Sequence, residues 1–191
     1  MFVVGSKNAM LGALTITQAS AHTGFPGGTG ANEVAGGGYA RVAATFGAAA
    51  AGIRSLSAGV NLTIPAGTTV RWLGLWDGGT FLGYAPNAGV PKEFIAYPGT
   101  DTVACQSHGY VDTNKVVFYG DTTPSPLVEG TVYYVRDAIA DTFKVAASPG
   151  GAAIDLTTAG GSGCVVSAIT EEVYGGGGTH TISTWVLGLP N

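Results

Sequence analysis

Charged residues are scarce in this sequence. They make up 10% of the chain, whereas about 25% is usual for a soluble globular domain. The eight lysines and arginines form no basic cluster, so we expect no nucleic-acid partner. A surface with few charges repels copies of itself only weakly. We therefore expect much of the surface to be buried in an assembly.

The sequence also lacks long apolar runs, and no basic residue precedes its apolar start. No run reaches the roughly 18 apolar residues of a membrane-spanning helix, so we expect no membrane partner. The apolar start, Met1 to Val4, has no basic residue before it, so we expect no secretion signal. The two cysteines, Cys105 and Cys164, are too few for a disulfide scaffold and lack metal-site spacing.

The side-chain sets that carry catalysis or bind metals do not occur at the required spacings. The three histidines are far apart in the sequence. We expect His22 and His108 to be loop or strand-end residues at contacts, and His180 to be an exposed strand residue. Glu171 and Glu172 are adjacent, so on a strand they point to opposite faces and cannot act as a carboxylate pair. The sequence thus predicts no enzyme, no cofactor and no metal. A weaker alternative is calcium bound by loop aspartates, namely Asp101, Asp112, Asp121 and Asp141.

Glycine, in contrast, is abundant: 32 residues, clustered between apolar runs. This pattern indicates many turns and many short strands. The centre of the chain, residues 61–85, predicts consecutive strands, with a run over 69–76, a tight turn at Asp77-Gly78-Gly79 and a returning strand over 80–84. Large rings concentrate here, and we assign the core to Trp72, Trp76, Phe81 and Tyr84, joined by Trp185.

The remaining segments predict an all-β protein with one domain inserted in another. A first strand is expected over 13–17, a long Gly-rich loop over 21–38, and a closing strand over 179–189. Five short strands are expected at 102–107, 115–119, 131–137, 142–146 and 164–168. We predict a jelly-roll-like β-sandwich from residues 1–99 plus 169–191, with a small β-barrel-like module, residues 100–168, inserted. The ends of an insertion lie close together, which puts Cys105 and Cys164 on neighbouring strands, either as buried free thiols, which we favour, or as a disulfide.

Several segments carry a family resemblance. The first part resembles structural proteins of tailed bacteriophages in LTIT, HTGFPGGTGANEV, YARVAATF and LTIPAGTTVRWLGLWDGGTFLGYAP. The inserted part is similar to a small β module that recurs in phage virion proteins, with the signature EGTVYYV, DTFKV and GGAAIDL. The resemblance covers most of the chain and implies a virion structural protein made in the cytoplasm of a bacterial host.

The resemblance implies a capsid decoration protein as the leading function. Such a protein would bind the major capsid protein on the capsid exterior as a homo-oligomer, most plausibly a trimer. Contacts would come from an extended N-terminal arm, residues 1–11, and from the Gly-rich loop; the residues concerned are Phe2, Val3, Val4, His22, Phe25, Asn32 and Glu33. The alternative is a tail fibre or baseplate module that binds host-surface glycans through exposed tyrosines of the inserted module: Tyr110, Tyr119, Tyr133 and Tyr134. The competing interpretation of these tyrosines is that alternate ones fill the module's own core.

Overall fold

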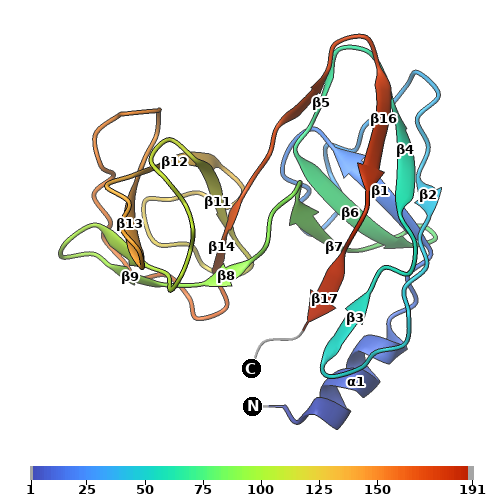
Figure 1. Cartoon of the computed structure of the whole chain (residues 1–191), viewed down its shortest axis with the longest axis horizontal. Coiled ribbons are helices and arrows are strands. Elements are labelled where there is room, and N and C mark those ends of the chain that lie inside the picture. The colour runs from blue at the N-terminus through green and yellow to red at the C-terminus, as the bar shows by residue number, and fades with distance from the viewer. Residues whose placement is uncertain (1, 189–191) are drawn as a thin grey trace. The chain divides into compact units, whose positions relative to one another are not determined.

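The regular secondary structure of the protein consists almost entirely of short antiparallel strands. A computed structural model describes residues 2–188 (Figure 1), in which one helix accompanies seventeen strands. The expected all-β class is confirmed. The described chain divides into two compact units, the first comprising residues up to Ala85 and from Glu172 onward, the second Pro86–Glu171.

The unit boundaries differ from those expected at 99/100 and 168/169. Residues 86–99 go with the inserted unit because they contain β8 (Lys92–Glu93) and β9 (Ile95–Tyr97), which pair with strands of that unit. On the other side, residues 169–171 stay with the inserted unit through hydrogen bonds such as Ile169 N to Lys115 O, 3.1 Å. Main-chain pairing, which the sequence pattern does not show, sets these limits.

The first unit contains one four-stranded sheet and three two-stranded ladders. The sheet has the order β2-β1-β6-β7, formed by β1 (Gln18–His22), β2 (Val42–Ala43), β6 (Trp72–Asp77) and β7 (Thr80–Pro86). The ladders pair β4 (Val60–Ile64) with β16 (Gly178–Ile182), β5 (Thr68–Val70) with β15 (Glu172–Tyr174), and β3 (Ile53–Ser55) with β17 (Val186–Gly188). The jelly-roll character of this unit stays a prediction.

Two runs expected as single strands are each divided in two. The run 69–76 breaks at Arg71, because β5 pairs with β15 while β6 pairs with β1. The closing run 179–189 is split into β16 and β17 because its two halves pair with different strands; Leu189 lies outside the described residues. The turn at Gly78-Gly79 is confirmed, since it joins β6 directly to β7.

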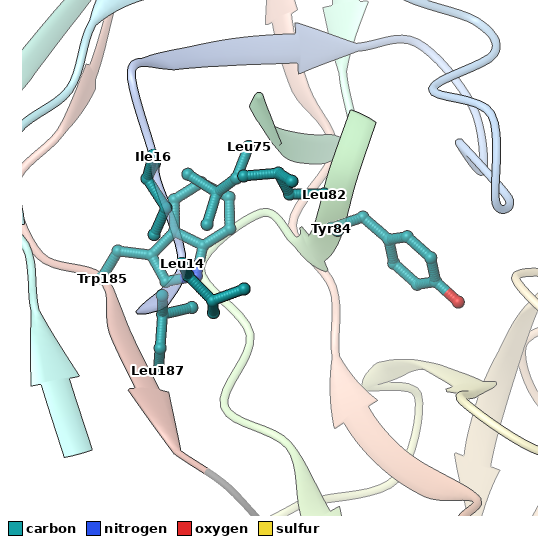
Figure 2. A pocket seen from close by; sticks show the side chains of 8 residues that line it. Leu14, Ile16, Leu75, Leu82, Tyr84, Trp185 and Leu187 are labelled. Carbon is teal, nitrogen blue, oxygen red and sulfur yellow. The ribbon is translucent and has the colours of Figure 1, made fainter. Parts of the chain in front are cut away.

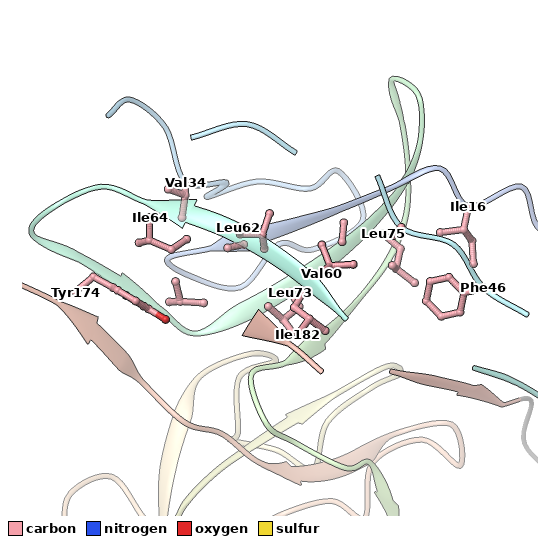
Figure 3. Close-up of a cluster of buried hydrophobic side chains, with 14 residues drawn as sticks. Ile16, Val34, Phe46, Val60, Leu62, Ile64, Leu73, Leu75, Tyr174 and Ile182 are labelled. Carbon is pink, nitrogen blue, oxygen red and sulfur yellow. The ribbon is translucent and has the colours of Figure 1, made fainter. Parts of the chain in front are cut away.

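The central strand β6 is buried on both faces. Its alternation sends Leu73 and Leu75 to one side, where they join an aliphatic core with Leu62 and Ile64 of β4 (Figure 3). Trp72 and Trp76 point to the opposite face, where they are almost fully buried among other rings. The expected core rings Trp72, Trp76, Phe81 and Tyr84 thus form a separate aromatic layer, while Trp185 packs against the aliphatic one.

The N-terminal segment is a helix, α1 (Val4–Ala13), where we expected an extended arm over 1–11 and a strand over 13–17. Both expectations are wrong; Met1 itself lies outside the described residues. Tertiary contacts account for the helix: Lys7 and Leu11, one turn apart, are buried on the same face. The Arg54 guanidinium donates to the carbonyls of Leu11 (3.1 Å) and Leu14 (2.6 Å), so it satisfies carbonyls at the helix C-terminus.

The inserted unit is one sheet in the order β8-β14-β11-β12-β13-β10-β9. Its further strands are β10 (Thr102–Ala104), β11 (Lys115–Tyr119), β12 (Val132–Arg136), β13 (Thr142–Ala146) and β14 (Val165–Ala168). The two terminal strands, β8 and β9, are separated by Phe94 alone, so one short segment pairs with both edges of the sheet. The sheet therefore closes on itself, which removes its free edges and agrees with the barrel-like module expected from the sequence.

Gly74 provides a test of the tight contact on the aromatic face of β6. A Cβ at Gly74 would lie 2.4 Å from Ser20 Oγ and 2.5 Å from His22 Nε2. We expect Gly74→Ala to lower the free energy of unfolding by about 1–3 kcal/mol or more, because buried side chains must move. Chemical denaturation followed by tryptophan fluorescence measures this change.

The matched control is Gly83→Ala, in β7 of the same sheet. A Cβ there meets nothing within 4 Å, so we expect a change within about 0.5 kcal/mol. Equal effects of the two substitutions would contradict the packing described for Gly74.

Candidate functional site

The Gly-rich loop lies on the aromatic layer of its own unit. The Phe25 ring packs edge-on against Trp72 and Tyr84, with ring centroids 5.1 and 5.0 Å apart. Gly30, at φ +75°, is so close to the Trp76 ring that an added Cβ would lie 2.6 Å from it. A glycine is required here both for the positive φ and for the close approach. The loop therefore closes over the rings of β6 and β7.

A continuous chain of hydrogen bonds runs through this layer. Trp76 Nε1–H can only donate, so it donates to Ser20 Oγ at 2.8 Å, and the Ser20 hydroxyl then donates to His22 Nε2 at 2.8 Å. The Ala31 carbonyl can only accept, so His22 Nδ1 carries the proton that bonds it at 2.8 Å. Every member is satisfied when His22 is neutral, and burial lowers the pKa of its imidazole.

An ion pair fixes the far end of the same loop. Arg41 binds the Glu33 carboxylate with Nε at 2.9 Å and Nη2 at 2.8 Å, and its guanidinium carbon lies 3.2 Å from the centroid of the Trp76 ring. Tyr39 OH donates to the same carboxylate at 3.2 Å. These contacts hold Glu33 against the aromatic layer.

The residues assigned to assembly contacts therefore have different environments. His22 is fully buried, while Phe25 and Glu33 are half-buried and held by their own unit. Asn32 is exposed, in a left-handed conformation (φ +58°), and its side-chain amide donates to Phe25 O at 2.8 Å. Phe2, Val3 and Val4 are exposed at the start of α1. Of the set, the N-terminal residues offer apolar surface to a partner.

An apolar hollow of about 130 Å³ is bordered by Leu14, just after α1 (Figure 2). Its walls come from the segment after α1, from β6 and β7, and from the C-terminal segment that includes β17; the side chains are Leu14, Ile16, Leu75, Leu82, Trp185 and Leu187. The ring of Tyr84, which also borders the hollow, points away from the others in Figure 2. Sequence reasoning missed this site because its walls are far apart in the chain.

All three histidines are buried, so the expected exposed position of His180 is wrong. His180 Nδ1 lies 3.0 Å from Glu172 Oε2 and 3.0 Å from Tyr174 OH. Glu171, which precedes Glu172 in the sequence, instead pairs with Lys115. The two adjacent glutamates thus have different partners, as their opposite directions on an extended chain required. His108 Nδ1 accepts a hydrogen bond from the Tyr110 backbone N–H at 2.9 Å.

The loop aspartates are engaged with the backbone. Each accepts a hydrogen bond from a main-chain N–H at 2.7–2.9 Å: Asp101 from Leu156, Asp112 from Ala138, Asp121 from Thr122 and Asp141 from Ser107. They stabilise turns of the inserted unit. Among residues 2–188, no group of three or more histidine, cysteine, aspartate or glutamate side chains is arranged to hold a metal ion.

The inserted unit keeps its thiols and most of its tyrosines inside. Cys105 and Cys164 are buried free thiols in its core, and burial raises the pKa of both, that of Cys164 to about 11. Of the four tyrosines considered for glycan stacking, Tyr110, Tyr119 and Tyr133 are buried and Tyr134 is half-buried. The interpretation of these tyrosines as an exposed glycan platform is therefore wrong.

These features define a charge-poor, all-β protein with an apolar N-terminal surface. Within the described range, no helix is long and apolar enough to cross a membrane. A family model described as podophage GP4 fiber I protein gp80 matches residues 7–94, a little under half of the chain. The match supports the expected class, a bacteriophage virion structural protein. No curated protein and no solved structure shows significant similarity to the chain.

The hydrogen-bond chain through His22 predicts a pH dependence of stability. Because burial lowers the folded-state pKa of His22 below its unfolded value of about 6.5, the unfolded state binds more protons below that pH. The free energy of unfolding should therefore fall as the pH drops through 6.5 towards the folded-state pKa. Denaturant titrations between pH 8 and pH 5 measure this slope.

The control is His22→Gln, which removes the titrating group and leaves the other two histidines in place. We expect this variant to be less stable at pH 8 and to lose stability less steeply on acidification. Identical slopes in the variant and the wild type would contradict the assignment of the pH dependence to His22.

Proposed function

We propose that this protein is a fibre-type structural subunit of a bacteriophage virion, with a structural and not an enzymatic role. The observation that carries the proposal is the position of the family match. Residues 7–94 run from α1 through the four-stranded sheet and end at Phe94, near the start of the inserted unit. The part similar to a fibre protein is therefore largely the first unit, and the inserted unit is an addition to it.

The first unit supplies the assembly contacts in this proposal. Exposed apolar side chains occur just before, along and just after α1: Phe2, Val3, Val4, Met10 and Leu14. Exposed contiguous apolar surface marks interaction sites in soluble proteins. We propose that this surface, together with the hollow beside Leu14, is covered by other copies of the chain in a homo-oligomer, a trimer being our proposal, or by a neighbouring virion protein.

Capsid decoration remains the second candidate. It is favoured by the low charge of the whole chain, since a surface that repels its neighbours weakly suits dense packing on a lattice. In that case the partner is the major capsid protein, and the protein lies on the capsid exterior. The two candidates use the same first-unit surface and differ in the virion component that it meets.

Location and copy number on purified virions distinguish the candidates. Immunogold labelling against the inserted unit, combined with quantitative mass spectrometry of whole particles, measures both. A fibre subunit should label the tail or discrete fibres at a copy number far below that of the major capsid protein. Label over the whole head at a copy number comparable to that of the major capsid protein would favour decoration and contradict the fibre assignment.

The apolar N-terminal surface can be tested by charge substitution. We expect Val4→Asp combined with Met10→Asp to reduce incorporation into particles roughly tenfold or more, because an unpaired charge in a buried interface costs several kcal/mol. Complementation of a phage lacking the gene, followed by quantification of the protein in particles, measures incorporation.

The control for this pair is Val128→Asp, on an exposed position of the inserted unit. It should leave incorporation unchanged, and all variants should keep the wild-type thermal unfolding midpoint. Normal incorporation of the double variant would contradict the assigned surface.

A further inference from the structure

The outer face of the inserted unit carries a distinct set of side chains. In β9, β10, β13 and β12, which are neighbours in the closed sheet, alternate residues point into the core. The residues between them point outward; we call the following six the Tyr97 face: Ile95, Tyr97, Thr102, Thr142, Lys144 and Arg136. Tyr97 is 49% exposed and Ile95 59% exposed, so this face presents an aromatic ring and an aliphatic side chain to solvent.

Strand register aligns these side chains into rows. Tyr97 lies opposite Thr102, and Arg136 lies opposite Lys144. Between β10 and β13, Ala104 lies opposite Thr142, and the same register continued by one pair of residues puts Thr102 opposite Lys144. Four strands at a spacing of about 4.8 Å place the ends of the Tyr97-to-Arg136 row about 14 Å apart. An aromatic ring, a hydroxyl and two cations thus follow one another across the sheet.

Lys144 differs from the other cations of this charge-poor chain. Arg41, Lys115 and Arg136 form ion pairs with carboxylates. Arg54, Arg71 and Lys92 donate to backbone carbonyls, and Lys7 is buried with an interaction of its own. Within residues 2–188, Lys144 alone among the eight has no hydrogen bond, ion pair or ring contact. Its positive charge therefore stays available to a ligand.

The acidic groups close to the Tyr97 face form no ion pair with Lys144. Asp101 and Asp141, in the turns before Thr102 and Thr142, accept hydrogen bonds from main-chain N–H groups. Asp137 pairs with Arg136 at 3.1 Å. These carboxylates are held in turns or by Arg136, and Lys144, beside Thr102, is the cation of the row that forms no ion pair.

We infer that the Tyr97 face binds an acidic polysaccharide of the bacterial cell surface. A sugar ring has an apolar C–H face that packs on an exposed aromatic ring, and it carries hydroxyls that bond to threonine hydroxyls. A carboxylate on the sugar completes the match with the ammonium of Lys144. A row of side chains across four neighbouring strands suits a polymer that lies across them. Several copies in one fibre would raise a weak affinity by multivalency.

This inference deepens the proposed function and rests on it for the ligand's source, since a fibre meets the cell surface. Its test is independent of assembly. The purified full chain is applied to a printed set of bacterial surface polysaccharides, grouped into uronate-containing and neutral members. We expect binding to uronate-containing members that weakens as the salt concentration rises, because exposed charges are screened.

Two substitutions and their conservative partners locate the binding. Tyr97→Ala should weaken binding about tenfold, as truncation of a central aromatic contact does, and Lys144→Gln should weaken binding and reduce its salt dependence. Tyr97→Phe and Lys144→Arg should bind like the wild type, because the ring and the charge are kept. Unchanged thermal unfolding of the four variants separates loss of binding from loss of folding.

Three outcomes overturn the inference: no binding to any uronate-containing polysaccharide, equal binding to neutral ones, or binding that survives both Tyr97→Ala and Lys144→Gln. None of them alters the proposed structural role, which depends on incorporation into particles. Conversely, if the protein were found over the capsid lattice while the purified chain still bound acidic polysaccharide through this face, the fibre assignment alone would be lost.

Discussion

The structure of the first unit depends on burial of β6 on both faces. Leu73 and Leu75 pack into the aliphatic core, while Trp72 and Trp76 face a second layer that strands alone do not cover. A tryptophan buried with an unbonded indole N–H would be costly. Ser20 and His22 of the neighbouring strand avoid that cost, because they link Trp76 Nε1 to the Ala31 carbonyl of the loop. The polar chain therefore joins sheet and loop in one layer.

This constraint explains the glycines around it. Gly74 leaves room on β6 for Ser20 and His22, and Gly30 lets the loop backbone approach the Trp76 ring. Both positions exclude a Cβ because the space is already filled by the aromatic layer. The abundance of glycine, which in the sequence indicates turns, here also permits close packing of the backbone on rings. The loop is part of the core of its unit, so the surface left for a partner lies at α1 and at the apolar hollow beside it.

The two units expose different kinds of surface. The first unit has the match to a fibre protein and the exposed apolar side chains near α1, which suits permanent contacts within a virion. The inserted unit closes its own sheet through the segment 92–97, so it presents no free strand edges and can display a face of ordinary side chains. On that face Lys144 differs from Arg136, because Arg136 pairs with Asp137 and Lys144 forms no ion pair.

Local pattern determined much of the protein. Alternation predicted the strands 115–119 and 142–146 with the bounds observed, and the two glycines after Asp77 predicted the β6–β7 turn, because period-two burial and turn chemistry act over a few residues. The chemistry of the His22 loop and the burial of His108 and His180 could not be predicted, since they depend on residues far away in the chain. For Tyr110, Tyr119 and Tyr133, the sequence left exposure and burial open, and the structure shows burial. The tertiary structure alone decided that residues 4–13 are helical, because Arg54 and the packing of Leu11 stabilise a segment with weak local signals. It also decided which faces are exposed, because exposure depends on strand order and register, which a single sequence does not state.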